Sequence, residues 1–293
     1  MKYKIDANFY DDLINVLRKK LLSLGFVVKP DEDKRNICLR FFNLKKRMVE
    51  PFPRAVLPAK EFSCPPEFND GLNILKEKIT KGQDITPHLS TGITDLDYND
   101  ALLNDWGIYH LHLGTVINNS GFVNRTNLLL FARFDNKYAY FINVMPHGSW
   151  TKQQFIRILH DNWPESIEMY RLKNVIGLER KISDDTYKSL RGANISTLVE
   201  IGDGIVYGLI GGGYTTSGLS IEVLRASDYY TNLVHKLEKD LRNNKNNIID
   251  SFIKENGIFK NELEFHLIMK NGEFHAIEKN SMKELNLSGM YNQ

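Results

Sequence analysis

Two histidines share a short predicted strand in the middle of the chain. Residues 106–114 read Trp-Gly-Ile-Tyr-His-Leu-His-Leu-Gly, and the pattern predicts a strand over residues 108–113. Because side chains alternate along a strand, His110 and His112 share one face, and we expect the opposite, more apolar face to pack on the core. Imidazole titrates near neutral pH, so the pair is typical of acid–base catalysis or metal binding. The alternative is a pair of surface or hydrogen-bonded histidines.

Other residues with chemical potential lie close to this strand in the sequence. Gly107 and Gly114 bracket it and allow another backbone or a ligand to approach. His147 lies between a predicted strand and a predicted helix, where loops often bring functional residues together. The backbone amides at the start of that helix are also suited to binding a phosphate or an oxyanion. A histidine that only caps the turn is the alternative.

Three cations and one glycine-rich loop are candidates for binding an anionic substrate. Arg125 and Arg133 flank or lie on a predicted strand, and Lys152 opens the helix after His147. Such cations can neutralise a phosphate, although each is also typical of an exposed structural residue. The loop over residues 211–218 is suited to form a nest of backbone donors, with a flexible turn as the alternative. Its candidate residues are Gly212, Gly213, Tyr214, Thr215 and Thr216.

Several well-known active-site motifs are absent from the sequence. It has no nucleophile elbow, no H-E-x-x-H and no clear P-D…E-x-K pattern. The glycine loop lacks the Gly-Lys-Ser/Thr ending of a nucleoside-triphosphate site. Three acidic residues near the histidine strand, Asp100, Asp105 and Asp135, leave a divalent-metal site open. His266 and His275 are predicted to share a face of the last hairpin as surface residues.

The elements that position these residues follow from hydrophobic periodicity and turn signals. Helices are expected over residues 8–24, 69–81 and 228–256. Another is expected to begin at a capping box of Thr151 and Gln154 and to end near residue 163. The asparagine cluster near residue 245 is expected to weaken the helix over residues 228–256. Strands are expected over 26–28, 36–42, 108–113, 127–134, 138–145, 197–201, 205–210, 220–224, 262–269 and 273–277. Residues 50–66 hold five prolines and are expected to be an extended linker or arm.

The order of these elements predicts an α+β fold with a central, mostly antiparallel sheet and flanking helices. We expect a helical and proline-rich region over residues 1–100 and an α+β core domain over residues 101–293. Composition is that of an ordinary globular protein, with 293 residues and a net charge of +2. The first fifty residues are locally basic, which fits either a solvated face or a nucleic-acid surface.

Two observations bear on location. Cys38 and Cys64 have no CxxC spacing, so neither a disulfide framework nor a cysteine-built zinc site is expected. No apolar segment reaches the roughly twenty residues that span a bilayer, and residues 1–6 lack the apolar core of a signal peptide. We therefore expect a cytoplasmic protein with no membrane partner.

Residues 106–163 resemble the RelE-like endoribonucleases of toxin–antitoxin systems. The likeness is architectural and consists of three strands followed by a helix, with His and Arg at the ends of elements. It covers about one fifth of the chain. The resemblance implies RNA cleavage by scattered His, Arg, Lys, Tyr or Glu side chains, generally without a metal, in a toxin or phage-defence context.

Three functional hypotheses follow. The first is an endoribonuclease or related phosphodiesterase without a tightly bound cofactor. Either His110 or His112 would be the general base, and the other of these two, or His147, would be the general acid. Arg125 would stabilise the negative charge on the phosphate. Lys152 or the glycine loop would assist Arg125.

The second hypothesis is a divalent-metal hydrolase that binds its metal through His110, His112 and either His147 or Asp135. The third is a non-catalytic module that binds nucleic acid or protein through the basic and aromatic surface. RNA is the favoured substrate, and an inhibitor protein or a second copy are candidate partners. If the first hypothesis holds, His147 and Arg125 should lie near the histidine strand.

Overall fold

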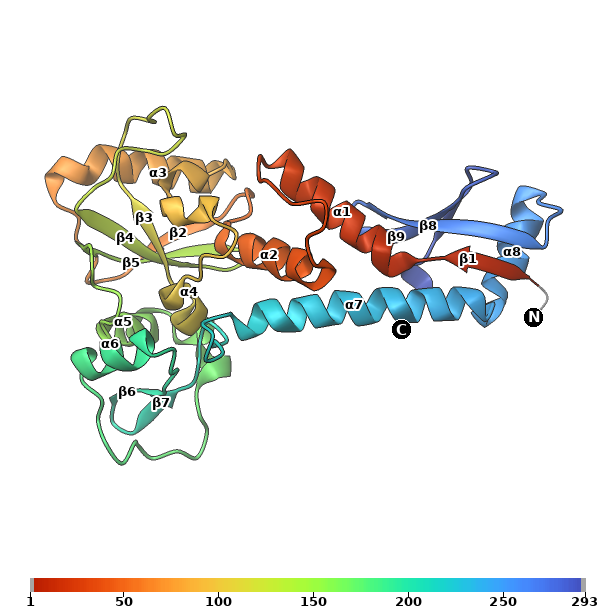
Figure 1. Cartoon of the computed structure of the whole chain (residues 1–293). Coiled ribbons are helices and arrows are strands. Elements are labelled where there is room, and N and C mark those ends of the chain that lie inside the picture. The colour runs from red at the N-terminus through yellow and green to blue at the C-terminus, as the bar shows by residue number, and fades with distance from the viewer. Residues whose placement is uncertain (1–2, 291–293) are drawn as a thin grey trace. The chain divides into compact units, whose positions relative to one another are not determined.

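The computed structural model describes residues 3–290, which divide into two compact units. The terminal unit comprises Met1–Phe42 and Leu224–Gln293, and the central unit comprises Asn43–Val223 (Figure 1). This division differs from the expected one at residue 100, because the first helix packs with the C-terminal hairpin. The ends of both expected regions, residues 1–2 and 291–293, lie outside the described residues. The fold is α+β, as predicted.

The terminal unit is built on a four-stranded sheet with the order β1-β8-β9-β10. Its strands are β1 (Lys4–Ala7), β8 (Glu262–Lys270), β9 (Glu273–Glu278) and β10 (Glu284–Asn286). Its helices are α1 (Phe9–Ser23), the first part of α2 (Lys34–Arg47), most of α7 (Ile221–Arg242) and α8 (Ile248–Asn256). The hairpin between β8 and β9 turns at Asn271 and Gly272, whose φ angles of 53° and 83° fit the predicted type I′ turn.

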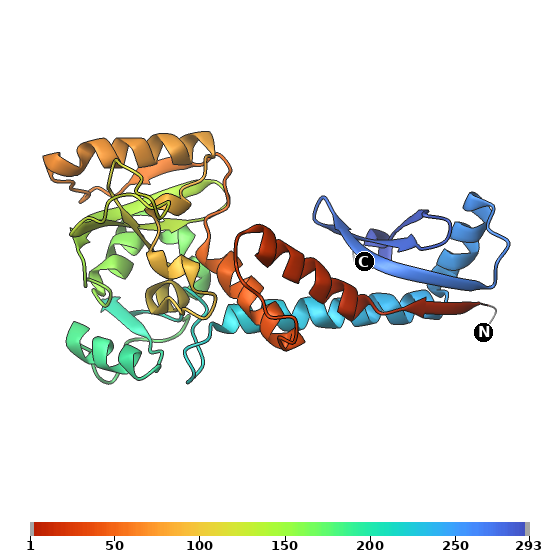
Figure 2. The same ribbon diagram turned by 45° about the horizontal axis from the view of Figure 1, so that its top comes forward.

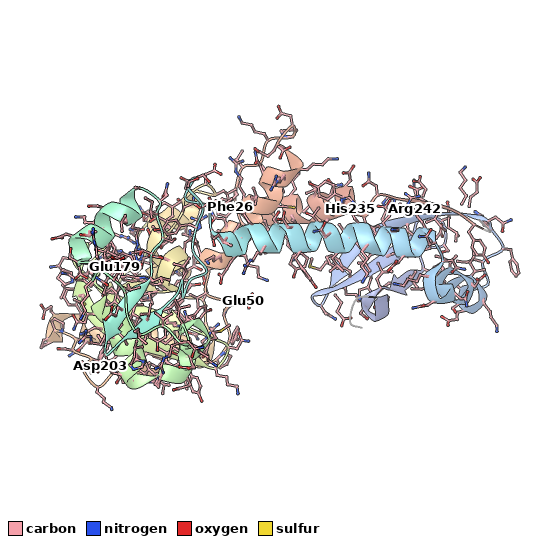
Figure 3. The ribbon with its side chains drawn as sticks, turned by 90° about the horizontal axis from the view of Figure 1, so that it is seen from below. Phe26, Glu50, Glu179, Asp203, His235 and Arg242 are labelled. Atoms are coloured by element: carbon pink, nitrogen blue, oxygen red, sulfur yellow. The ribbon has the colours of Figure 1, made fainter. Side chains whose placement is uncertain are left out.

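The outer edge of β1 is covered by a side chain from α7. Arg242 donates hydrogen bonds to the carbonyl oxygens of Ile5 and Ala7. Figure 3 shows Arg242 near the far end of α7, beyond His235. Because an uncovered edge strand presents unpaired backbone groups to other chains, this contact closes an edge that would otherwise be open to pairing.

The central unit holds the histidine strand at the edge of a second four-stranded sheet with the order β2-β5-β4-β3. Its strands are β2 (Ala55–Pro58), β3 (Tyr109–His112), β4 (Leu128–Phe134) and β5 (Tyr138–Pro146), and a separate pair consists of β6 (Val199–Gly202) and β7 (Ile205–Tyr207). Its helices are α3 (Asn69–Lys81), α4 (Ala101–Trp106), α5 (Gln154–Asn162) and α6 (Asp184–Gly192).

Helices cover both faces of the central sheet (Figure 2). Helix α5 packs with Trp106, Ile108 and Phe131 in one apolar cluster. Helix α3 lies against the opposite face and touches the end of β3 through Gly71. Both faces of β3 are therefore buried: Leu111 and Leu113 pack on the core as expected, and the histidine face is buried as well.

Several predicted elements are confirmed. Helix α3 has the predicted bounds and ends at Gly82 with φ of 67°. The three central strands are antiparallel neighbours in the order expected. The long C-terminal helix breaks at the asparagine cluster, where Asn244, Asn246 and Asn247 adopt positive φ. The turn between β6 and β7 contains Asp203, labelled in Figure 3.

Other predicted elements are wrong. Residues 26–28 form no strand, residues 36–42 belong to helix α2, and residues 221–224 begin helix α7. In α2 the buried residues Cys38 and Phe42 are four apart, which is helical spacing hidden inside a short apolar run. The capping box at Thr151 does not form, since the start of α5 is instead capped by Asp184, which accepts from the Gln153 amide at 3.1 Å.

The proline-rich stretch is ordered and includes β2, which pairs in parallel with β5. Four of the basic residues in the first fifty form ion pairs: Lys34 with Asp11, Arg40 with Glu32, Lys45 with Glu50, and Lys46 with Glu222. Cys38 and Cys64 are free thiols. Among residues 3–290, none of the helices combines the length and apolar character that crossing a membrane requires.

Gly71 provides a test of how α3 holds the histidine strand. A Cβ at this position would lie 1.8 Å from the carbonyl oxygen of Leu113, so Gly71→Ala must push α3 away from β3. We expect the variant to lose about 2 kcal/mol or more of unfolding free energy, although alanine favours a helix by about 1 kcal/mol. Chemical denaturation followed by tryptophan fluorescence measures this, since Trp106, Trp150 and Trp163 all belong to the central unit.

The matched control is Gly192→Ala in α6, where a Cβ meets nothing within 4 Å. Its stability should remain within about 0.5 kcal/mol of the wild type. Equal stability of the Gly71 and Gly192 variants would contradict the close packing of α3 on β3.

Candidate functional site

One cleft in the central unit gathers most of the chemically capable side chains. It has a volume of about 420 Å³ and is lined by residues from β3, α4, α6 and the segments beside them. Its charged and histidine lining residues are His110, Arg125, His147, Asp100, Lys188 and Arg191. Three of the four predicted catalytic residues therefore lie together, although more than 30 residues separate the first from the last.

Trp150 brings the two cleft histidines together. Its ring lies 4.6 Å from that of His110 and 4.9 Å from that of His147, between ring centroids. It also contacts Phe131, which in turn packs on Phe155 of α5. The indole is thus part of the core on one side and of the cleft on the other, which fixes the positions of both imidazoles.

His110 is a buried imidazole with one side toward a carboxylate. Its side chain is 10% exposed, and its Nδ1 lies 3.6 Å from Oδ2 of Asp100. Burial lowers the pKa of His110, the charges of Arg125 and His147 lower it further, and Asp100 opposes them. A neutral ring with its Nδ1 proton toward Asp100 leaves Nε2 as a proton acceptor, which is the form that a general base requires.

Asp100 is held in place by the start of α4. Its Oδ1 accepts from the backbone amide of Leu103 at 3.0 Å, so it is the N-cap of that helix. Beside it lies a cavity of about 20 Å³, lined in part by Arg47, Tyr109 and His110, with room for one water molecule.

His112 supports the site from behind and does not line the cleft. It is 1% exposed, and its Nδ1 accepts from the backbone amide of Thr126 at 3.0 Å. Burial is the main reason that the pKa of His112 is lowered to about 3, so the ring is neutral at physiological pH. Its carbonyl oxygen contacts Nδ1 of His88 at 2.8 Å. Direct proton transfer to a substrate does not fit this position.

Arg125 reaches the cleft because the backbone comes very close to the end of β3. A Cβ on Gly114 would lie 2.2 Å from the carbonyl oxygen of Asn124, so only glycine fits there without a shift. One Arg125 nitrogen donates to the carbonyl of Leu89 at 3.0 Å. The guanidinium is thereby anchored and keeps further donors for a ligand. Gly114 serves a backbone approach, one of the two roles predicted for it.

A buried ion pair completes the cleft wall. Nη2 of Arg191 lies 2.7 Å from Oδ2 of Asp105, and both side chains are almost fully buried. The guanidinium also donates to the Trp150 carbonyl and lies 4.3 Å from the Trp106 ring centroid. Arg191 therefore orders the wall around Trp150. Lys188, one helical turn earlier on α6, is exposed at the same cleft.

Two predicted cations lie elsewhere. The Arg133 guanidinium lies 5.7 Å from the Tyr170 ring, and Arg133 does not line the cleft. Lys152 is half exposed and lies 3.4 Å from Asp184. Both have structural partners, which is the alternative that the sequence left open.

The predicted metal site does not fit the structure. Asp135 lies in the turn before β5 and His147 directly follows the end of the same strand, so the strand length separates them. The Asp135 carboxylate already accepts from two backbone amides and from the Tyr140 hydroxyl. Within residues 3–290, no three His, Cys, Asp or Glu side chains are grouped so as to hold a metal ion. His110, His112, His147 and Asp135 therefore do not form a coordination site.

The glycine loop is occupied by internal contacts. The amides of Gly211 and Gly213 donate to the carbonyls of Asp105 and Asn104 at 2.8 Å, and the Gly212 amide donates to Leu209. Tyr214 is buried, Thr215 bonds within the loop, and the Thr216 carbonyl accepts from Asn194. Because its amides already have partners, the loop cannot serve as the predicted anion nest. It packs against α4 instead.

The two hairpin histidines belong to the terminal unit and are diagonal neighbours on one face, as predicted. His266 is half exposed. His275 is buried, so its prediction as a surface residue is wrong. The reason is β10, a strand that the sequence did not reveal; it pairs with β9 and brings Glu284 to 2.8 Å from Nδ1 of His275.

Comparison with protein-family models, with curated proteins and with solved structures finds no match to this chain. Sequence reasoning missed His88, Lys188 and Arg191 at or behind the cleft, and it noted Asp100 only as a nearby acid. Of these, Asp100 carried a usable signal, because an aspartate before a short apolar run is a common helix N-cap.

The buried position of His112 predicts a pH dependence of stability. Its pKa is about 3 in the folded protein against 6.5 for an ordinary histidine, so the unfolded chain binds the proton more strongly. Stability should therefore fall as pH drops below about 6.5, with a slope from this residue approaching about 1.4 kcal/mol per pH unit. In His112→Asn, an amide oxygen can still accept from Thr126 without titrating, and the slope should be shallower by about that amount.

Tryptophan-detected denaturation at a series of values from about pH 6.5 to about pH 4 measures the slope. His266→Asn, a change at a half-exposed histidine of the other unit, is the control and should leave it unaltered. An identical slope in His112→Asn and in the wild type would show that His112 is not held neutral by burial.

Proposed function

We propose that this protein is a metal-independent endoribonuclease or related phosphodiesterase that uses histidine acid–base chemistry. The observation that supports this proposal most strongly is the meeting of His110, His147 and Arg125 in one cleft, around Trp150. Two imidazoles beside fixed cations provide a base, an acid and stabilisation of charge on a phosphorus centre.

The residues have distinct roles in the proposed reaction. His110 Nε2 takes the proton from a ribose 2′-hydroxyl, whose oxygen then bonds to the adjacent phosphorus. The bond from phosphorus to the 5′-oxygen breaks, and that oxygen takes a proton from protonated His147. Arg125 and Lys188 stabilise the negative charge on the phosphoryl oxygens, and the products are a 2′,3′-cyclic phosphate and a free 5′-hydroxyl. Asp100 orients His110.

Substitution of the two cleft histidines tests this assignment. His110→Ala and His147→Ala should each lower the rate of RNA cleavage by about 10²–10⁴-fold, because each removes a proton-transfer step. His266→Ala, at a histidine of the terminal unit, is the matched control and should keep the full rate. A fluorogenic RNA oligonucleotide measures the rates. Full activity in both cleft variants would overturn the proposal.

The chemistry of the nucleophile gives a second test. A chimeric oligonucleotide with a single 2′-deoxyribose at the scissile position should resist cleavage at that position, since it lacks the attacking hydroxyl. Cleavage of the all-ribose parent should persist in excess chelator, because protein side chains carry every proton transfer. Cleavage of the deoxy position, or full loss with chelator, would favour a hydrolase with another nucleophile.

The biological setting forms part of the proposal only through resemblance. The likeness of residues 106–163 to RelE-like toxin endoribonucleases favours a cytoplasmic toxin or phage-defence enzyme, with an inhibitor protein or a second copy as partner. The non-catalytic alternative has less support, because four basic residues of the first fifty are already paired with carboxylates.

A further inference from the structure

An exposed aromatic ring lies at the edge of the proposed catalytic cleft. Tyr98 is 37% exposed, lines the cleft, and is two residues before Asp100. Tyrosine combines an apolar ring with a polar hydroxyl, which suits it to surfaces that bind a partner. The proposed chemistry at His110 and His147 makes no use of this ring.

The Tyr98 ring is held rigidly although it is exposed. A Cβ on Gly92 would lie 2.8 Å from the ring, so the ring packs directly on that glycine. The Arg47 guanidinium lies 5.7 Å from the ring centroid and is itself fixed by hydrogen bonds to the carbonyls of Asn43, Gly92 and Asp95. Asn43 also donates to the Tyr98 carbonyl at 3.0 Å. Backbone and ring are therefore both anchored before any ligand binds, which reduces the entropy lost on binding.

The residue after Tyr98 offers an unused hydrogen-bond acceptor. Oδ1 of Asn99 is buried and has no hydrogen-bond partner among residues 3–290, while its Nδ2 donates to the Asp97 carbonyl. Asn99 also lines the cleft. A buried acceptor without a partner is costly, so it favours a ligand that brings an N–H donor.

We propose that Tyr98 and Asn99 form a nucleobase-binding site beside the phosphate-binding part of the cleft. A nucleotide combines the three features that this surface complements: an anionic phosphate for Arg125 and Lys188, a flat π-face for Tyr98, and ring or exocyclic N–H donors for Asn99 Oδ1. A base must be unstacked to lie on the ring, so the substrate class is single-stranded RNA and not a duplex. The inference rests on the proposed function for the identity of the bound nucleotide.

Calorimetric titration of the full chain tests the base site without any need for catalysis. The probes are adenosine 3′-monophosphate, which has a base, and ribose 5-phosphate, which has none. We expect the wild type to bind the nucleotide at least about tenfold more tightly than ribose 5-phosphate, because one stacked base contributes about that much affinity. Tyr98→Ala should remove this advantage, and Tyr98→Phe should retain it because the stacking face remains.

Two controls separate loss of the base site from loss of the fold. Tyr98→Ala should bind ribose 5-phosphate as the wild type does, which shows that the cleft is intact. Tyr229→Ala removes an exposed tyrosine of the terminal unit and should leave both affinities unaltered. Asn99→Ala should weaken nucleotide binding severalfold through the lost acceptor.

The outcomes distinguish this inference from the proposed function. Equal affinity of the wild type for the two probes, or unaltered nucleotide affinity in Tyr98→Ala, overturns the base site even if RNA is cleaved. Nucleotide binding that depends on Tyr98 in a protein that cleaves no RNA supports the base site and overturns the nuclease proposal. Cleavage of single-stranded but not of duplex RNA by the wild type, lost in Tyr98→Ala, supports both.

Discussion

Burial of both faces of β3 is the constraint on which the candidate site depends. The strand is the edge of its sheet, yet α3 covers one face, while α5 and Trp150 cover the other. A histidine in such a place loses its hydration, and this disfavours the charged form. The packing that stabilises the sheet therefore also sets the protonation state of His110. Stability and chemistry are connected through the same contacts.

The Arg191–Asp105 pair has a corresponding role in the cleft wall. A buried ion pair contributes little net stability compared with a well-packed apolar pair, yet removal of one partner costs about 3–5 kcal/mol because the other charge stays buried. Arg191 comes from α6, Asp105 from α4, and the Trp150 carbonyl that Arg191 contacts comes from the segment before α5. One guanidinium thus joins three parts of the wall. This explains a fully buried charge at a place where apolar residues would be easier to accommodate.

Local patterns predicted the parts of the site that depend on local structure. Strand alternation placed His110 on a defined face, and the short turn after β4 predicted that β4 and β5 are antiparallel neighbours. The antiparallel order of β3, β4 and β5 brings His147 and Arg125 to the same end of the sheet. Long-range contacts decided the rest. The depth of His112 depends on helices distant in sequence, and the cap of α5 comes from Asp184. The glycine loop lost its donors to α4. None of these partners can be identified from spacing within a short window.

Helix α4 links the proton chemistry to the cleft wall. It has only six residues, but its N-cap Asp100 faces His110 and its fifth residue Asp105 pairs with Arg191. It ends at Gly107, whose φ of 66° turns the chain directly into β3. A shift of this helix would alter the orientation of His110 and the position of Arg191 at once. Asp100 caps the helix through Oδ1 and faces His110 through Oδ2, so formation of the helix and orientation of the base depend on one carboxylate.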